Sequence, residues 1–251
     1  MNLGIHNRVA LVAAASQGLG KACAQALAAE GARVAILSRR PEAYDGVALA
    51  VPCDLADASQ IDSAVSRVAG ELGPVEILIN NCGGPPAGSF DTITEAQWAE
   101  SFQQVFLSAL RLTRAVLPGM RRARWGRIVN IVSMSVEQPI AGLIVSNAFR
   151  PALAGWAKTL AAEVASDNIL VTCVAPGRIL TARTEVLDRA ASDKTGRPLD
   201  QIRAERVASI PLKRYGTPEE FAAVVAFLAS ERASYQTGSV LRVDGGAVMG
   251  I

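Results

Sequence analysis

Short apolar runs rich in β-branched residues alternate with longer segments of helical period along almost the whole chain. Two neighbouring parallel strands need a crossover of about a dozen residues or more, which a helix usually supplies. The alternation is therefore typical of an α/β fold of the doubly wound Rossmann type, a parallel sheet with helices on both faces. Strands are expected at residues 8–14, 33–37, 47–51, 76–80, 127–132, 170–174 and 239–243. Helices are expected at about residues 19–30, 58–72, 96–123, 148–166 and 218–230.

The 251 residues contain no linker or repeat, so the seven expected strands predict a single domain over residues 1–251. Residues 181–210 interrupt the alternation, because they are polar, charged and longer than an ordinary connection. Such a stretch predicts a lid over a binding site rather than a disordered insert. Its five arginines could meet an acidic substrate, but five interspersed acids nearly balance them. The composition therefore favours a solvated helical lid.

Charge and cysteine usage exclude several classes of function. Lys and Arg number 25 against 23 Asp and Glu, without a block of like charge, so no affinity for nucleic acid is expected. The apolar run at residues 9–15 is too short to span a membrane, and no membrane contact is expected. Four cysteines without a Cys-x-x-Cys pair and a single histidine predict no metal site and a reduced, cytoplasmic setting.

A glycine turn follows the first expected strand. It consists of Ser16, Gln17, Gly18, Leu19 and Gly20 and leads directly into a helix. Backbone N–H groups at the start of a helix attract phosphate, and glycine lets the backbone come close to it. The turn predicts a pyrophosphate site, with an ordinary glycine turn as an equally weighted alternative for this motif alone.

Four further motifs follow later strands in the same register: Asn-Asn-Cys-Gly at 80–83, a serine at 133, Pro-Gly at 176–177 and Val-Asp-Gly-Gly at 243–246. Together with the glycine turn, these spacings resemble the short-chain dehydrogenase/reductase family from about residue 8 to residue 246. Residues 210–220 and 237–239 are most similar to its 3-oxoacyl-carrier-protein reductase branch. The resemblance implies a nicotinamide dinucleotide, hydride transfer to or from a small carbonyl or alcohol substrate, and a homotetramer.

The resemblance also implies which residues hold the dinucleotide. The glycine turn would hold the pyrophosphate, although Ala13 and Ala14 replace the family's Thr and Gly, for which a wider turn is expected. The family's contacts to the adenine fall on Asp54 and Leu55. Its contacts to the adenosine ribose fall on Asn81, Cys82 and Gly83. Its contacts to the nicotinamide carboxamide fall on Pro176, Gly177, Ile179 and Thr181. Cys82 replaces an alanine, and a small buried hydrophobe is favoured over a reactive thiol.

The end of the second strand bears on the choice between NAD and NADP. Family members that use NAD usually place an acid here for the ribose hydroxyls, whereas this chain has Ser38, Arg39 and Arg40. A guanidinium can pair with a 2′-phosphate through two hydrogen bonds. Arg39 and the missing acid therefore favour NADPH over NADH, with a solvated arginine pair as the alternative.

The catalytic positions depart from the family pattern of Ser followed by Tyr-x-x-x-Lys. Only Ser133 is unchanged, because Tyr has become Ser146 and Lys has become Arg150. The family's catalytic Asn corresponds to Val105. A serine hydroxyl is several pKa units more basic than a tyrosine, and each unit costs about 1.4 kcal/mol in proton transfer. Ser146 is therefore a poor general acid.

Arg150 cannot give up a proton, but it can bond the nicotinamide ribose and present positive charge to an oxyanion. Ser133, Ser146 and Arg150 would then stabilise an alkoxide while water supplies the proton. Pro151 predicts that the helix starts late, with Ser146 or Asn147 as its cap. For Ser146, this capping role has the same weight as a role in catalysis. The motifs favour a divergent NADP-dependent reductase. A dinucleotide-binding protein without catalysis is the alternative, and an enzyme of another reaction type carries the least weight.

Overall fold

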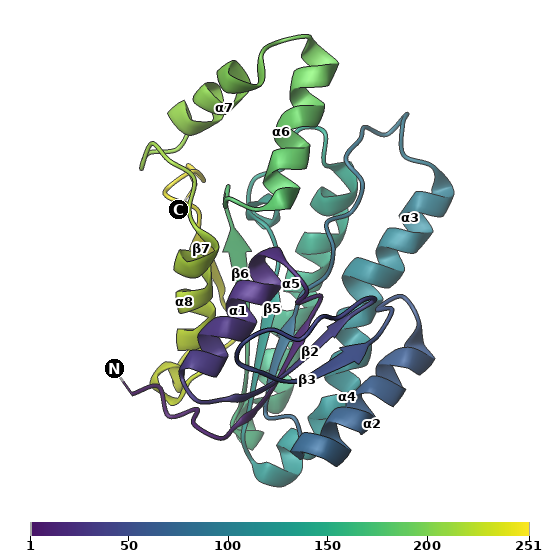
Figure 1. The fold of residues 1–251 in the computed structure, drawn as a ribbon, viewed down its shortest axis with the longest axis vertical. Helices are drawn as coiled ribbons and strands as arrows, with labels where there is room; N and C mark the ends of the chain where they lie inside the picture. The colour runs from purple at the N-terminus through teal and green to yellow at the C-terminus, as the bar shows by residue number, and fades with distance from the viewer. Residues whose placement is uncertain (1, 251) are drawn as a thin grey trace.

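Seven strands pair in parallel into one sheet in the order β3-β2-β1-β4-β5-β6-β7 (Figure 1). The structure is a computed structural model and describes residues 2–250. The strands are β1 (Val9–Ala13), β2 (Arg33–Ser38), β3 (Val47–Pro52), β4 (Ile77–Asn80), β5 (Gly126–Ile131), β6 (Ile169–Pro176) and β7 (Val240–Val243). All seven predicted strands are confirmed, and each boundary lies within two residues of the expected one.

Eight α-helices are found in the described part of the chain. They are α1 (Gly18–Ala29), α2 (Ala58–Leu72), α3 (Glu95–Ser101), α4 (Ser108–Ala123), α5 (Ile144–Val164), α6 (Ala182–Thr195), α7 (Leu199–Ala208) and α8 (Pro218–Leu228). Between residues 2 and 250, no helix combines the length and the apolar character that crossing a membrane requires.

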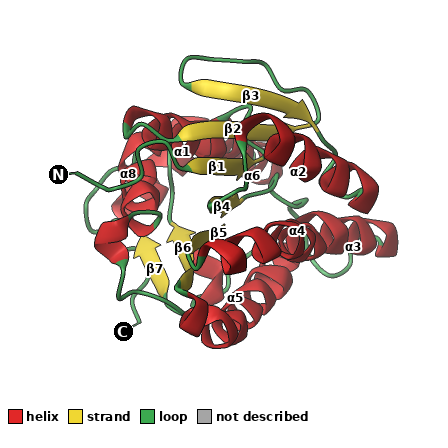
Figure 2. Cartoon of the chain, turned by 90° about the horizontal axis from the view of Figure 1, so that it is seen from below, coloured by secondary structure: helices red, strands yellow, loops and turns green. Residues whose placement is uncertain are grey.

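The sheet separates two layers of helices, as Figure 2 shows from below. All five residues of β1 are buried, and they alternate between the two faces. Leu11 packs in the cluster that includes α2, α4 and α5, whereas Val12 packs in the cluster that includes α1 and α8. Burial on both faces is why the strands appear in the sequence as continuous apolar runs.

The strand order reverses beside β1. The chain runs from β1 outward to β2 and β3, and then returns to place β4 on the other side of β1. In open α/β sheets, ligands bind outside the carboxyl ends of the strands at such a reversal. The topology therefore points to the carboxyl edge of the sheet, after β1 and β4, as the functional edge.

The prediction of a single helix at residues 96–123 is wrong in detail. The structure divides it into α3, a π-helical segment (Phe102–Leu107) and α4. A helical period in the sequence does not distinguish these forms, because the apolar positions stay on one face. Single π-helical turns often occur at functional sites, and this one carries Val105, which is buried.

The expected late start of the helix at Pro151 is also wrong. α5 begins at Ile144, four residues before the expected start, and contains Pro151 in its interior. Neither Ser146 nor Asn147 is the cap. Asn147 instead bonds both backbone groups of Ile140, donating to its carbonyl at 2.9 Å and accepting from its N–H at 3.1 Å. These bonds hold the first turn in place and offset the hydrogen bond that Pro151 lacks.

Residues 181–210 form α6 and α7, which stand beyond the carboxyl edge of the sheet in Figure 1. The buried carboxylate of Asp188 on α6 pairs with Arg206 and, at 3.6 Å, with Arg203, both on α7. The Tyr215 hydroxyl lies 3.2 Å from the same carboxylate. The helical character predicted for this stretch is confirmed, and its movement as a lid stays a prediction.

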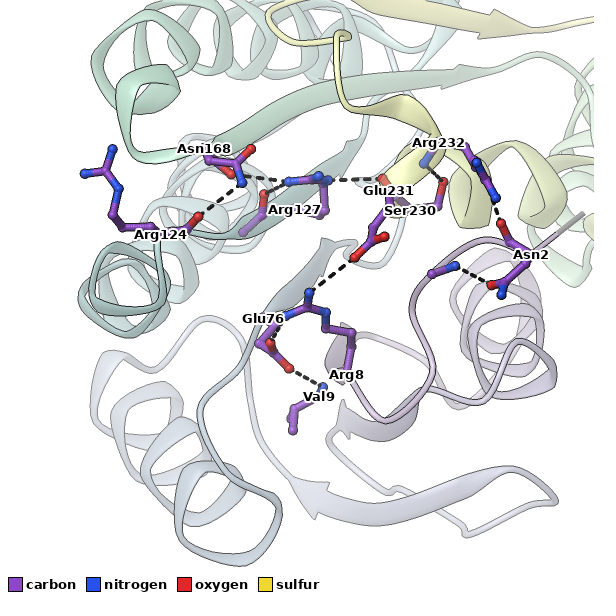
Figure 3. Close-up of polar contacts among 12 residues, drawn as sticks. Asn2, Arg8, Val9, Glu76, Arg124, Arg127, Asn168, Ser230, Glu231 and Arg232 are labelled. Carbon is purple, nitrogen blue, oxygen red and sulfur yellow. Dashed lines mark hydrogen bonds and ion pairs between the residues drawn. The ribbon is translucent and has the colours of Figure 1, made fainter.

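The opposite, amino edge of the sheet is closed by arginines (Figure 3). Arg8 bonds Glu76 at 2.5 Å and Glu231 at 3.4 Å. Arg127 is 2% exposed and donates to the carbonyls of Ser230, Gly126 and Asn168. Both guanidinium groups lie over the ring of Trp125, 3.9 Å and 4.4 Å from its centroid. Burial, together with the charge of Arg8, lowers the pKa of Arg127 to about 10.

Candidate functional site

The turn between β1 and α1 fits a phosphate group. Gly18 has a φ of 58°, in the left-handed region. A Cβ on Gly20 would lie 2.5 Å from the Ala14 carbonyl oxygen and 2.8 Å from Asn81 Nδ2, so only glycine fits there. Gln17 gives α1 no side-chain cap, and the first turn holds no acid. The start of the helix therefore keeps backbone N–H groups for an anion.

Ala14 occupies the turn position for which we expected a wider turn. The structure instead holds Ala14 in the left-handed region, at a φ of 47°, and its carbonyl accepts a hydrogen bond from Asn81 Nδ2 at 3.2 Å. A left-handed conformation costs a residue with a Cβ about 1–2 kcal/mol. The turn thus accommodates the alanine through strain. Ser16 is exposed, and Leu19 packs partly against the core.

The end of β2 presents polar groups without partners. Ser38 is 7% exposed, and its hydroxyl makes no hydrogen bond within residues 2–250. A buried hydroxyl without a partner costs about 1–3 kcal/mol, which a bound ribose or phosphate oxygen would offset. Arg39 and Arg40 follow it and are exposed. The residues after β2 therefore fit a phosphorylated ribose.

Asp54 and Leu55, assigned to the adenine by resemblance, lie after β3. The Asp54 carboxylate accepts a hydrogen bond from the Ala56 N–H at 3.0 Å. Leu55 is 8% exposed and packs in the hydrophobic core. Its side chain is therefore part of the core, and a contact of Leu55 with an adenine would come mainly from its backbone.

Tyr44 belongs to this side of the site, although no sequence motif marks it. Its hydroxyl donates to the Ala15 carbonyl at 2.8 Å, and the Lys21 ammonium lies 4.8 Å from its ring centroid. Burial, with a smaller effect of Cys23, raises the pKa of Tyr44 to about 12. Tyr44 therefore braces the glycine turn from the loop before β3.

The residues after β4 come next to the glycine turn. Asn81 reaches back to Ala14, as described, and Gly83 is exposed with open space where a Cβ would stand. Cys82 is only partly buried, unlike the other three cysteines, and its sulfur lies 3.3 Å from Arg150 Nη2. The structure thus gives Cys82 a charged neighbour, which its interpretation as a small buried hydrophobe in place of the family's alanine did not suggest.

Three serines cluster after β5. Ser133 accepts a hydrogen bond from the Ser135 N–H at 3.1 Å and so caps a short 3-10 helix (Met134–Val136). The hydroxyls of Ser135 and Ser146 lie 3.5 Å apart. The structure therefore brings Ser133 and Ser146 together through Ser135, a residue that the sequence motifs did not single out. The sequence signal that could have identified Ser135 is its position two residues after Ser133.

Arg150 is the central charged group of this edge. It is 6% exposed and donates from Nη1 to the Ile131 carbonyl at the end of β5, at 2.6 Å. A small hollow beside it is lined by polar and apolar side chains from β4, the π-helical segment, α4 and α5, among them Asn80, Val105, Ser108 and Leu153. Asn80 is buried there, and its Oδ1 has no partner among the described residues.

The segment after β6 closes the other side. Pro176 ends β6, and the Gly177 N–H donates to the Val243 carbonyl at 2.9 Å. Ile179 is 4% exposed and packs in the core. Thr181 caps α6 by accepting from the Thr184 N–H. A Cβ on Gly18 would lie 3.8 Å from Thr181 Cγ2, so the start of α6 adjoins the glycine turn.

The carboxyl edge of the sheet therefore brings together most of the predicted site: residues 16–20, 81–83, 133, 146, 150 and 176–181. The site extends past β2 through residues 38–40 and past β3 through Asp54. The chain supplies an uncapped helix start for a pyrophosphate, a buried hydroxyl without a partner for a ribose, and one buried cation, Arg150, near the end of β5. These residues fit a nicotinamide dinucleotide. Across residues 2–250, no group of three His, Cys, Asp or Glu side chains is placed to hold a metal ion.

Comparisons with known proteins agree with this geometry. Residues 13–248 match the family described as enoyl-(acyl carrier protein) reductase. The chain is 35% identical over 244 residues to the 3-oxoacyl-[acyl-carrier-protein] reductase MabA of Mycobacterium bovis, with 97% of this chain and 94% of the relative covered. It is 35% identical over 256 residues to the 3-oxoacyl-[acyl-carrier-protein] reductase FabG of Vibrio cholerae, with 98% and 100% covered.

Solved structures are similar over the full length as well. The L-sorbose reductase of Gluconobacter frateurii, solved with NADPH and L-sorbose, has a TM-score of 0.92 and 32% identity, with 100% of both chains covered. YwfH, an NADPH-dependent reductase involved in bacilysin biosynthesis, has a TM-score of 0.90 and 29% identity, with 97% of this chain and 99% of the other covered.

Proposed function

Because the chain belongs to the short-chain dehydrogenase/reductase family, in its 3-oxoacyl-carrier-protein reductase branch, we propose that it is an NADP-dependent oxidoreductase acting on a carbonyl or a secondary alcohol. The observation that carries the proposal is the placement of Arg150. A buried guanidinium lies beside Cys82 and at the end of β5, on the edge where the glycine turn fits a dinucleotide. Structures of reductases with bound or required NADPH support the cofactor.

The choice of NADP rests on the end of β2. Arg39 and Arg40 are exposed, and no acid accompanies them at the point where an NAD-dependent relative would place one. The orphaned Ser38 hydroxyl offers a further donor. A 2′-phosphate would accept charge-assisted hydrogen bonds from the arginine side chains and a hydrogen bond from the Ser38 hydroxyl.

The chemistry that a bound nicotinamide supplies is hydride transfer. Ser133 and Ser146 would donate hydrogen bonds to the carbonyl oxygen, and Arg150 would hold the ribose and stabilise negative charge on that oxygen. Arg150 keeps its proton, so water from the open edge supplies the proton that completes the alcohol. Without a tyrosine, the reaction is expected to be slow or restricted to easily reduced carbonyls.

A second candidate, a dinucleotide-binding protein without catalysis, is favoured by one observation. All three tyrosines lie outside the serine and arginine cluster: Tyr44 bonds Ala15, Tyr215 bonds Asp188, and Tyr235 is fully exposed. No tyrosine of the chain therefore replaces the missing general acid from another element.

Single-turnover oxidation of bound NADPH over a panel of ketones, diketones and quinones separates the two candidates. We expect measurable oxidation that falls when Ser133 or Arg150 is changed to Ala. Arg150→Ala should also weaken NADPH binding by about 1–3 kcal/mol, the range for a lost hydrogen bond to a charged group. Tight NADPH binding with no oxidation, and no response to either change, would favour the protein without catalysis.

We further propose a homotetramer and a cytoplasmic location. The tetramer rests on the family resemblance and on the apolar C-terminal residues, of which Met249 is 91% exposed in a single chain. The location rests on the four cysteines, all of which are free. Sedimentation equilibrium checks the tetramer, and a monomer at micromolar concentration would contradict it.

A further inference from the structure

Two arginines share the carboxyl edge near the reactive position. Arg150 comes from α5 and is held by Ile131 and Cys82, as described. Arg183 comes from the first turn of α6, where it is half-buried and donates from Nη2 to the Pro85 carbonyl at 2.6 Å. Its side chain lies against Gly84, since a Cβ there would be 2.6 Å from Arg183 Nε. Arg183 therefore crosses from α6 to the loop after β4.

Neither guanidinium pairs with a carboxylate of residues 2–250. The hydrogen bonds of Arg183 and Arg150 go only to backbone carbonyls and to the Cys82 sulfur. Burial lowers the pKa of Arg183, and the positive charge of nearby Arg150 lowers it further. Both guanidinium groups thus contact the loop after β4, Arg150 at Cys82 and Arg183 at Gly84 and Pro85, without a counter-ion.

The other arginines of residues 181–210 show that this is not a general property of the stretch. Arg203 and Arg206 pair with Asp188, and Arg197 pairs with Glu205. Arg189 is exposed to solvent. The near balance of charge in the sequence therefore does not hold locally. Acids pair with three of the five arginines, Arg189 is in solvent, and Arg183 is the one that is partly buried without a carboxylate.

An uncompensated cation that is partly buried raises the free energy of the protein, and an anion bound between two guanidinium groups lowers it. Each guanidinium carries five N–H donors, of which the structure uses one in Arg183 and two in Arg150. A carboxylate matches the planar fork of a guanidinium and accepts two hydrogen bonds from it. The unused donors thus fit a carboxylate.

We propose that Arg183, together with Arg150, binds a carboxylate of the substrate, so that the enzyme acts on 2-oxo or 3-oxo acids or the matching hydroxy acids. This inference rests on the proposed reductase function. The short separation between carboxylate and carbonyl follows from the loop after β4, where Arg150 contacts Cys82 and Arg183 contacts Gly84 and Pro85, two and three residues further along the chain. Arg183 is then the residue that determines specificity for an acid.

A phosphate of the dinucleotide is the other source of negative charge. The pyrophosphate position at Gly18 adjoins Thr181, two residues before Arg183. Arg183 itself extends away from that turn, to Gly84 and Pro85 after β4. Its direction therefore favours the substrate, and the experiment separates the two sources.

The test is calorimetry on the full chain saturated with NADP⁺, which cannot reduce the probe. The probes are 2-oxobutanoate and 3-oxobutanoate, each with its uncharged methyl ester. We expect at least one acid to bind about tenfold or more tightly than its ester. Arg183→Met should remove about tenfold of the acid's affinity while the affinities for the ester and for NADP⁺ stay unchanged. Arg183→Lys should keep a reduced preference for the acid, and Arg189→Met, on the same helix, should change nothing.

Equal binding of acid and ester, or an Arg183→Met variant that keeps the preference, would overturn the inference. A loss of NADP⁺ affinity in Arg183→Met, without loss of acid preference, would assign the anion to the dinucleotide and also overturn it. Absence of NADP⁺ binding to the wild type would refute the proposed function instead. In that case the same titrations without NADP⁺ decide the inference, and equal binding of acid and ester overturns it.

Discussion

Two pairs of arginines lie at opposite ends of the parallel sheet, and only one pair is neutralised by the protein. At the amino end, Arg8 bonds Glu76 and Glu231, and Arg127 donates three hydrogen bonds to backbone carbonyls. At the carboxyl end, Arg150 and Arg183 have no carboxylate among residues 2–250. The first pair is complete as the chain folds. The second leaves positive charge without a protein partner.

The difference separates a structural role from a functional one. A buried cation is costly to a fold unless hydrogen bonds and opposite charge surround it. The amino end meets that condition, and Trp125 adds an aromatic face to both guanidinium groups. The carboxyl end does not meet it, and it is also the end where the strand order reverses and ligands of such sheets bind.

The largest effect is expected from restoring the family's general acid at the carboxyl end. Ser146→Tyr combined with Arg150→Lys should raise the single-turnover rate of carbonyl reduction by about 10² to 10⁴-fold, because a positioned general acid contributes that much. The intact start of α5 places residues 146 and 150 one turn apart, which favours the gain. Buried Val105 in place of the family's Asn works against it.

Ser133→Ala added to the restored pair is the control, and it should remove most of the gain. An unchanged rate in a variant that still binds NADPH would show that the edge lacks more than an acid. It would weaken the case for a reductase site.

The free energy of unfolding should depend more on the arginines at the amino end of the sheet than on those at the carboxyl end. Arg127→Met is expected to lower the free energy of unfolding by about 3 kcal/mol, because the three hydrogen bonds of a buried guanidinium to backbone carbonyls are lost. Arg150→Met should change it by less than about 1 kcal/mol, since the removal of a buried charge without a counter-ion also removes its desolvation cost, which offsets the lost hydrogen bond to the Ile131 carbonyl. Urea unfolding measures both. Equal losses in the two variants would remove the distinction between the two ends.

The fold was predictable from the sequence because each strand is buried on both faces and so appears as a continuous apolar run. The start of α5 was not, because it depends on the tertiary bonds between Asn147 and Ile140, and local rules give Pro151 more weight than it has here. The π-helical segment before α4 was missed for a related reason, since its apolar period is that of a helix.

The dinucleotide side of the site was predictable to a similar extent. The glycine turn carries its signal in adjacent residues, and the structure places it beside Asn81 and Thr181. Arg183 was not predictable, because residues 181–210 contain five acids against five arginines and one lysine, a near balance that singles out no arginine. Which acid neutralises which arginine is decided only when α6 packs on α7 and Asp188 turns to Arg206.

A smaller effect is expected at the two ends of a single strand, β2. Arg39→Ala, after the carboxyl end, should weaken NADPH binding by about 1–3 kcal/mol and leave NADH binding unchanged, because the 2′-phosphate loses a charge-assisted pair. Arg33→Ala, at the amino end, removes a bond to the Leu72 carbonyl and should leave both affinities unchanged. Calorimetry with both dinucleotides checks this. Equal affinities of the wild type for NADPH and NADH would contradict the choice of NADP.

The smallest effect concerns backbone strain, which also differs between the ends. Ala14, at the carboxyl end, is left-handed at a φ of 47°, whereas Asn168, at the amino end, is left-handed at 58°. Asparagine tolerates this region, and the Asn168 side chain also donates to the Arg124 carbonyl at 3.1 Å (Figure 3). Alanine has no such compensation.

Ala14→Gly should therefore raise the free energy of unfolding by about 0.5–1 kcal/mol. Glycine removes about 1–2 kcal/mol of left-handed strain but costs part of that in conformational entropy of the unfolded chain. Asn168→Gly, the matched variant, should lower stability, because it removes a hydrogen bond and relieves little strain. Urea unfolding of both variants gives the comparison. If Ala14→Gly proves less stable than the wild type, then the turn is not strained, and Ala14 contributes through its packing instead.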